Sequence, residues 1–124
     1  MNRNRLAWPT IGFGIVLLLL AACAPPTPEF PTGRFVGPEG LDEFEFNEDG
    51  TFSYFFEQSS TPEVVGTYSI DGDLYTDETN SSEDCPFPGS YTWTYDDPIL
   101  TFRLVEDECE GRRSVYVQRF TGPQ

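Results

Sequence analysis

Cysteines and carboxylates are the side chains of this 124-residue chain that could do chemistry. The chain contains Cys23, Cys85 and Cys109, together with 21 Asp and Glu residues. It has no His, and all seven of its cationic side chains are Arg, so Lys is absent as well. Without an imidazole or an amine there is no Ser–His or Ser–Lys pair for nucleophilic catalysis, and no His-ligated metal.

Paired acids could do acid–base work, and examples are Asp96-Asp97 and Glu106-Asp107-Glu108. Both fall where turns are expected. A carboxyl group can act as a general acid or base near neutral pH only when desolvation or a neighbouring charge shifts its pKa, and turn residues are solvated. We therefore expect charged turns at these positions, no catalytic residue and no enzyme activity.

The acidic loop at residues 77–84 is a candidate calcium site. It contains four carboxylates, and Ca²⁺ takes six to eight oxygen ligands. However, Ser82 and Pro88 stand where an EF-hand loop has its Gly and its terminal Glu. A solvated polar loop is the favoured interpretation, so we expect no metal site and no cofactor.

Cys23 ends an N-terminal segment with the features of an export signal. Arg3 and Arg5 precede an apolar run from Ile11 to Ala22, which is shorter than the roughly 20 residues of a membrane-spanning helix. The run ends in Leu20-Ala21-Ala22-Cys23, which resembles the lipobox of bacterial lipoproteins. The resemblance implies that residues 1–22 are a lipoprotein signal peptide and that Cys23 carries a lipid. The alternative is an ordinary cleaved signal that leaves Cys23 as a free thiol.

Residues 23–32 are expected to form a tether between the lipid anchor and a folded domain at 33–124. Four prolines in this segment favour an extended chain, which at about 3.1 Å per residue would span roughly 25 to 30 Å. We therefore expect the domain to face the extracytoplasmic side of the cell membrane or the outer membrane. Signal removal leaves five Arg against 21 acidic residues, a net charge of −16, which repels nucleic acid.

The segment from residue 33 onward alternates apolar and polar residues in short runs, which predicts an all-β domain. The expected strands are 33–37, 41–47, 51–57, 63–70, 74–78, 89–95, 99–105 and 113–120, and no run has a helical period long enough for a helix. Tight hairpins and one apolar face per strand favour a small eight-stranded antiparallel up-and-down barrel, since closure removes exposed edges. An open sandwich of two four-stranded sheets is the structural alternative.

Tight turns at residues 48–50, 71–73 and 96–98 predict how the flanking strands pair. The expected registers are Phe46 opposite Phe52, Phe44 opposite Tyr54, Tyr68 near Thr76, Trp93 opposite Phe102 and Tyr95 opposite Leu100. The last register, continued outward, brings Cys109 opposite the neighbour of Cys85. Two Cys without His fall short of the four ligands of structural zinc. An even Cys pair in an oxidising compartment predicts a Cys85–Cys109 disulfide.

Several short motifs resemble those of bacterial lipocalin-like domains of the calycin type. Gly33-Arg34-Phe35 opens the first expected strand where lipocalins have Gly-x-Trp, and Gly66-Thr67-Tyr68 and Gly89-Ser90-Tyr91-Thr92-Trp93 repeat a Gly-to-aromatic pattern. Arg119 lies in the last expected strand. The resemblance implies that Arg119 packs across Phe35 and closes one end of the barrel.

Barrel geometry leaves two functions open, because eight strands enclose either a filled core or one small ligand. The first hypothesis is a monomeric, membrane-anchored lipoprotein whose barrel binds a small apolar or aromatic molecule. The residues expected to line its cavity are Tyr54, Tyr68, Trp93 and Phe102. Tyrosines suit such a site because a buried hydroxyl needs a partner. The alternative is a structural or protein-interaction lipoprotein of the cell envelope with a filled core.

Overall fold

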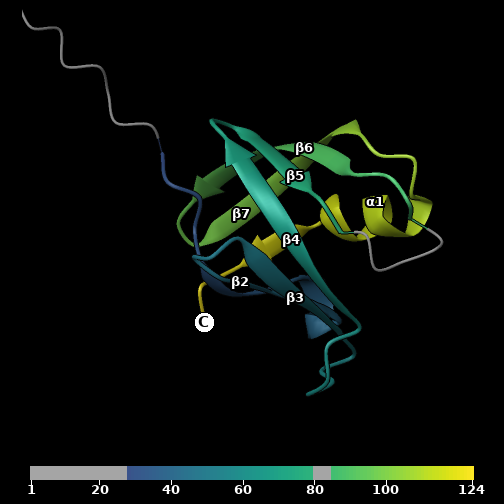
Figure 1. Ribbon diagram of the computed structural model, residues 1–124. Coiled ribbons are helices and arrows are strands. Elements are labelled where there is room, and N and C mark those ends of the chain that lie inside the picture. Colours follow the sequence, from purple (N-terminus) through teal and green to yellow (C-terminus); the bar gives the residue numbers. More distant parts are fainter. Residues whose placement is uncertain (1–27, 80–84) are drawn as a thin grey trace, which may run out of the picture.

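The chain forms a closed barrel of eight antiparallel strands in the computed structural model, which describes residues 28–79 and 85–124 (Figure 1). The strands are β1 (Gly33–Val36), β2 (Asp42–Phe46), β3 (Thr51–Phe56), β4 (Val64–Asp71), β5 (Leu74–Asp77), β6 (Gly89–Asp96), β7 (Ile99–Glu106) and β8 (Arg119–Thr121). Each strand pairs with its neighbours in the chain, and β8 pairs with β1. The predicted up-and-down barrel is confirmed. The expected signal peptide and Cys23 lie outside the described residues.

The hairpin between β2 and β3 has the predicted register. Phe46 pairs with Phe52, and Gly50 has a φ of 82°, the left-handed conformation that this three-residue loop requires and that Gly adopts without strain. The Asp49 carboxylate accepts hydrogen bonds from the Thr51 amide at 3.0 Å and the Thr51 hydroxyl at 2.6 Å. Turn chemistry thus determines which β2 and β3 side chains face the interior.

The hairpin between β4 and β5 is shifted by one residue from its predicted register. Its loop has only two residues, so Tyr68 pairs with Asp77 instead of lying near Thr76. A slip of one residue moves every side chain to the other face of a strand. As a result, Tyr75 and Asp77 face the interior.

The predicted strand at 113–120 is wrong in its first half, because residues 113–116 belong to a helix and the strand begins only at Arg119. Helix α1 (Glu110–Tyr116) crosses one end of the barrel and precedes the short strand β8 (Figure 1). Seven residues make two turns, too few for a 3.6-residue apolar period to be recognised. Tyr116 is buried and packs on Tyr91, with 4.6 Å between ring centroids. None of the helices in the described ranges is long and apolar enough to cross a bilayer.

The interior of the barrel is filled mainly by aromatic rings, and Phe30 closes the end opposite α1. The sequence assigned Phe30 to the tether, but its side chain is buried. Its ring centroid lies 5.2 Å from those of Phe46 and Trp93 and 5.5 Å from that of Tyr75. Phe30 therefore belongs to the folded domain, and the chain enters the barrel at this end.

Candidate ligand-binding cavity

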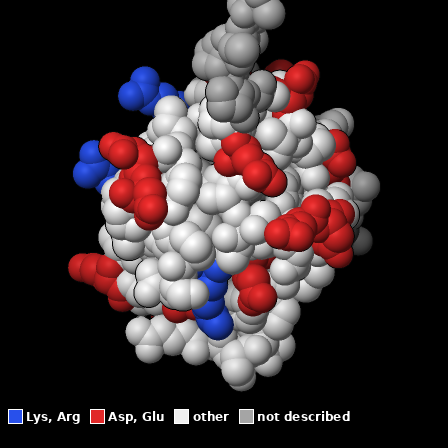
Figure 2. Space-filling view, turned by 90° about the vertical axis from the view of Figure 1, so that its left-hand side faces the viewer, with Lys and Arg blue, Asp and Glu red and all other residues white. Residues whose placement is uncertain are grey.

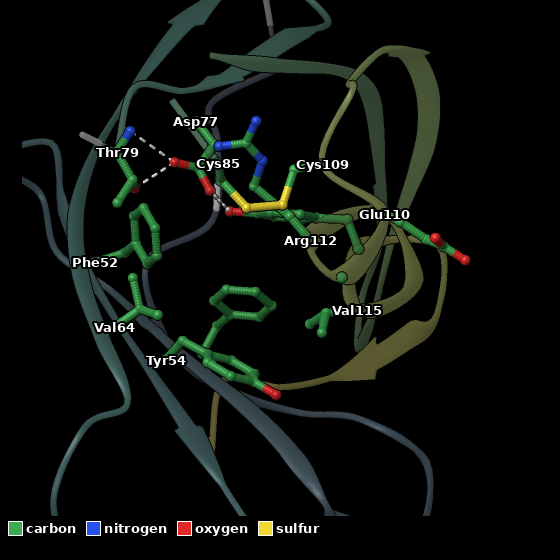
Figure 3. A pocket seen from close by; sticks show the side chains of 13 residues that line it. Phe52, Tyr54, Val64, Asp77, Thr79, Cys85, Cys109, Glu110, Arg112 and Val115 are labelled. Carbon is green, nitrogen blue, oxygen red and sulfur yellow. Dashed lines mark hydrogen bonds between the residues drawn. A yellow bond between two sulfur atoms is a disulfide. The ribbon is translucent and has the colours of Figure 1, made fainter. Parts of the chain in front are cut away.

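A cavity of about 550 Å³ lies between the barrel interior and α1 (Figure 3). Its volume is within the range of small-molecule sites, which measure about 300 to 1,000 Å³. The side chains that line it come from β2, β3, β4, β5, α1 and the segments next to the disulfide. They are Phe44, Phe52, Tyr54, Val64, Asp77, Thr79, Cys85, Cys109, Glu110, Arg112, Val115 and Tyr116, together with Gly111.

One part of the cavity wall is apolar and aromatic. Tyr54 and Val64 are directly opposed on β3 and β4, so their side chains project from the same face of the sheet. Phe44 packs against Tyr54 with 5.3 Å between ring centroids, and Val115 of α1 lies across from them (Figure 3). The Tyr54 hydroxyl donates its single hydrogen to Asp42, a residue that does not line the cavity, so only its acceptor capacity is left for a ligand.

The other part of the cavity contains a buried carboxylate. Asp77 is 2% exposed, and its Oδ1 accepts hydrogen bonds from the Thr79 amide at 2.9 Å and from the Thr79 hydroxyl (Figure 3). Its Oδ2 accepts from the Tyr116 hydroxyl at 2.9 Å, which lies 2.7 Å from the Tyr75 hydroxyl. Three donors compensate the cost of burying this charge. Asp77 was expected in a solvated loop and is instead part of the barrel interior.

Burial has its largest effect in this network on the pKa of the two tyrosines. It raises the pKa of both Tyr75 and Tyr116 well above the ordinary tyrosine range, and the nearby Asp77 charge raises it further. Both hydroxyls therefore remain protonated at neutral pH. Because the Tyr116 hydroxyl donates its hydrogen to Asp77, Tyr75 is the donor and Tyr116 the acceptor in the hydrogen bond between the two tyrosines.

A second carboxylate, Asp107, is buried behind α1 and holds Arg112. Asp107 is 5% exposed, and Arg112 donates to its two oxygens from Nε and Nη2, each at 2.7 Å. Asp107 also accepts from the Tyr91 hydroxyl and from the Cys109 amide at 2.9 Å. Burial alone would raise the pKa of Asp107, but the hydrogen bonds from these groups outweigh it and lower the pKa. The sequence predicted a charged turn here, which is wrong for Asp107.

One nitrogen of Arg112 has no hydrogen-bond partner. The side chain is only 9% exposed, and its Nη2 also donates to the Phe87 carbonyl at 2.6 Å. Nη1 is the single buried side-chain nitrogen or oxygen without a partner among the residues that the structure describes. Arg112 lines the cavity, but this nitrogen has almost no accessible surface, so protein atoms enclose it.

The predicted Cys85–Cys109 disulfide is confirmed, with 5.2 Å between the two Cα atoms. Both cysteines line the cavity, and Cys109 directly precedes α1. The bond therefore connects the segment before β6 to the start of the helix. Its position beside the cavity, at the same end as Asp77 and Arg112 (Figure 3), could not be read from the cysteine count.

The four residues expected to contact a ligand lie in different parts of the barrel. Tyr54 lines the cavity. Trp93 and Phe102 pair across β6 and β7 as predicted, but both pack around Phe30 in the filled part of the core. Tyr68 also packs against Phe30, and its hydroxyl donates to the Asn47 carbonyl at 2.6 Å. The structure therefore brings Tyr54 together with Asp77, Arg112 and Tyr116 instead.

Phe35 and Arg119, expected to close the barrel together, are on opposite sides of its wall. Phe35 is fully buried, whereas Arg119 is exposed. Phe120, the residue after Arg119 on β8, faces the interior. Side chains alternate between faces along a strand, so Arg119 points outward, and Phe30 supplies the closure at the other end.

Comparison with known proteins leaves the function to be argued from this cavity. No family model, curated protein or solved structure matches the chain. The closed eight-stranded barrel is consistent with a lipocalin-like fold, but one fold serves many functions. The function is therefore inferred from the cavity and its charged groups.

Proposed function

We propose that this protein is a lipid-anchored, extracytoplasmic, non-catalytic binding protein that holds one small, mainly apolar or aromatic molecule in the cavity beneath α1. The observation that carries the proposal is the cavity itself, with an apolar and aromatic wall and a small set of convergent polar groups. Small-molecule sites usually have this composition. The anchor is inferred from Arg3, Arg5 and the Leu20-Ala21-Ala22-Cys23 sequence.

The polar groups around the cavity favour binding over catalysis. Asp77 accepts three hydrogen bonds, and Asp107 accepts four. The hydrogen bonds to Asp107 lower the pKa of its carboxyl group, which makes it a weak proton acceptor. The same hydrogen bonds hold the surrounding side chains in place, which lowers the side-chain entropy that the protein loses when a ligand binds.

A fluorescent apolar probe, N-phenyl-naphthylamine, tests this proposal in the exported full chain carrying Cys23→Ser. We expect one saturable site. Val64→Phe places a ring in the cavity and should weaken binding by about tenfold or more, because the added volume competes with the probe. Val65→Phe is the matched control, since Val65 is the next residue on β4 and is 57% exposed.

Two results would contradict the proposal. One is the absence of saturable binding together with no small molecule co-purifying with the native protein by mass spectrometry. The other is equal probe affinity in the two valine variants. Either result would favour the alternative, an envelope lipoprotein that acts through its surface.

The specific observation behind that alternative is the filled half of the core together with the acidic exterior. Trp93 and Phe102, expected in a cavity, are fully packed. On the face shown in Figure 2, acidic side chains surround a largely uncharged centre, with isolated Arg side chains among them. Such a surface repels nucleic acid and anionic lipid, so a partner would have to be a protein with a complementary basic surface.

A further inference from the structure

The cavity beneath α1 ends at a layer of aromatic rings inside the barrel. Phe44 and Tyr116 form part of its wall. Phe46, Tyr75 and Phe102, here called the aromatic plug, pack against these two side chains and do not line the cavity. The Phe46 ring stacks on Phe44 with 5.2 Å between centroids, and the centroids of Tyr75 and Phe102 lie 5.4 and 5.1 Å from that of Tyr116. The cavity therefore does not continue into the rest of the barrel.

The aromatic plug is closely packed. Each of its three side chains is at most 3% exposed. The Tyr75 centroid lies 4.9 Å from that of Phe102 and 6.0 Å from that of Phe46, and Phe30 packs against Phe46 at 5.2 Å. Aromatic rings at these separations are in contact, and such interiors contain few voids larger than a water molecule. A ligand in the cavity therefore meets a solid floor.

A second cavity, of about 490 Å³, lies at the Phe30 end of the barrel. Phe30, Tyr68 and Ile70 are among the residues that line it, and it shares no lining residue with the cavity beneath α1. The aromatic plug lies between the two sets of lining residues, since it packs on Phe30 and on Tyr116. Within the part of the chain that the structure describes, the two cavities thus form no continuous channel for an extended molecule.

A rigid ring system and a flexible chain fill such a space at different cost. The cavity beneath α1 measures about 550 Å³, and the aromatic plug prevents a long chain from extending beyond it. The chain must therefore bend or leave part of its length in water, and it loses conformational freedom at each bond that becomes fixed. A fused ring has no such bonds, and Phe44, Phe52 and Tyr54 in the wall offer it aromatic contacts.

Building on the proposed function, we propose that the cavity selects compact ring molecules over long acyl chains, and that the aromatic plug determines this specificity. The ligand lies against Phe52, Val64 and Val115 (Figure 3). Phe46 is the key residue of the plug, because its ring touches both Phe44 in the cavity wall and Phe30 at the far end.

A series of linear alcohols from hexan-1-ol to tetradecan-1-ol tests the length limit. Affinities are measured by displacement of N-phenyl-naphthylamine from the chain carrying Cys23→Ser. Each added CH₂ that is buried should tighten binding about fourfold, and we expect this gain to stop before tetradecan-1-ol. Phenanthren-9-ol has the same number of carbons and one hydroxyl, and it should bind about tenfold more tightly than tetradecan-1-ol, because it has no chain to order.

Phe46→Ala tests the role of the aromatic plug. The change removes the ring on which Phe44 stacks and leaves space behind the cavity wall, so the gain in affinity should continue to longer alcohols than in the wild type. Phe30→Ala is the matched control. It also removes a buried Phe ring, but one that does not line this cavity, so the length limit should not change. Should Phe46→Ala fail to fold, Phe46→Leu should move the limit in the same direction.

The possible failures are distinguishable. Absence of displacement by the alcohols and by phenanthren-9-ol, together with no saturable binding of N-phenyl-naphthylamine, would overturn the proposed function and this inference with it. Affinity that rises steadily through tetradecan-1-ol, tighter binding of tetradecan-1-ol than of phenanthren-9-ol, or the same length limit in the Phe46 variants and the wild type would overturn this inference alone.

Discussion

At the scale of single residues, two glycines leave room for the polar side chains at one end of the cavity. A Cβ at Gly89 would overlap the Asp107 carboxylate, and a Cβ at Gly66 would overlap the Thr79 hydroxyl and approach the Phe52 ring at 2.9 Å. These are the glycines of the two Gly-to-aromatic motifs in the sequence. Their recurrence has a physical basis here, since each leaves space for a group that supports a buried carboxylate.

We predict that Gly89→Ala lowers the free energy of unfolding by about 1 to 3 kcal/mol, as overpacking of a well-packed core does. Urea denaturation measures the change. Gly111→Ala is the control, because a Cβ at that helical position meets nothing within 4 Å and should be neutral or slightly stabilising. Equal stabilities of the two variants would argue against the packing of the Asp107–Arg112 pair described above.

The buried tyrosines predict a loss of stability at alkaline pH. Burial raises the pKa of Tyr75 and Tyr116 well above its ordinary value in the folded state, so only the unfolded state ionises near pH 10. Their contribution to stability is fully present below that pH and decreases as pH rises above it. Tyrosinate absorbance should appear together with unfolding followed by circular dichroism. Tyrosinate absorbance that appears fully before unfolding would contradict this prediction.

At the scale of elements, α1 depends on covalent and tertiary support. Seven residues are too few for a stable isolated helix, and α1 is held by the disulfide at Cys109, by the Arg112–Asp107 pair and by the packing of Tyr116. The helix forms one side of the cavity, so its stability and ligand binding are coupled.

We predict that the double variant Cys85→Ser, Cys109→Ser loses about 3 kcal/mol of stability, since the bond closes a loop between residues 24 apart in the chain. Probe affinity should fall as well, because the start of α1 is released. Urea denaturation and fluorophore titration measure the two effects, with reduced wild-type protein as a matched sample. Two alkylatable thiols at these positions in unfolded, unreduced protein would contradict the disulfide itself.

The elements that sequence could predict are those with local turn chemistry. The loop with Gly50 and the run from Trp93 to Phe102 have unambiguous alternation, and their registers are confirmed. The turn at Gly72 admits loops of different length, and a one-residue error there concealed Asp77. Helix α1 has no recognisable periodicity, so the Asp107–Arg112 pair that depends on it could not be predicted. The predicted disulfide was the one sequence feature that pointed to this pair, since Asp107 and Arg112 both lie within three positions of Cys109.

At the scale of the whole molecule, the barrel has two unlike ends. Phe30 fills one end with aromatic contacts, and the cavity and α1 occupy the other. Trp93 packs edge-on against Phe30 and is the only Trp of the chain after residue 22. Its emission therefore reports on the Phe30 end of the barrel.

We predict that Phe30→Ala lowers stability by about 3 to 5 kcal/mol, as large-to-small changes at buried Phe positions do, and shifts Trp93 emission to longer wavelength. Phe87→Ala is the control, because Phe87 is 58% exposed and should change neither quantity. Unchanged stability and emission in Phe30→Ala would show that the segment before β1 does not close the barrel.

We predict that the exported wild type fractionates with membranes and that Cys23→Ser is released. Two acyl chains give a stable anchor because each buried CH₂ contributes about 0.8 kcal/mol. Detergent-free fractionation after export measures the difference. Equal solubility of the two proteins would remove the lipid anchor from the proposed function.

The burial of Phe30 also determines where the cavity would exchange its ligand. With a lipid on Cys23, six residues would separate the anchor from Phe30, and the seven rises from Cys23 to Phe30 would span about 22 Å in a polyproline II conformation. The chain enters the barrel at the Phe30 end, while α1 lies at the opposite side (Figure 1). The cavity would then face the aqueous space and not the acyl chains. Such a protein would capture molecules already dissolved around the cell, and it would be poorly placed to extract them from the membrane that holds it.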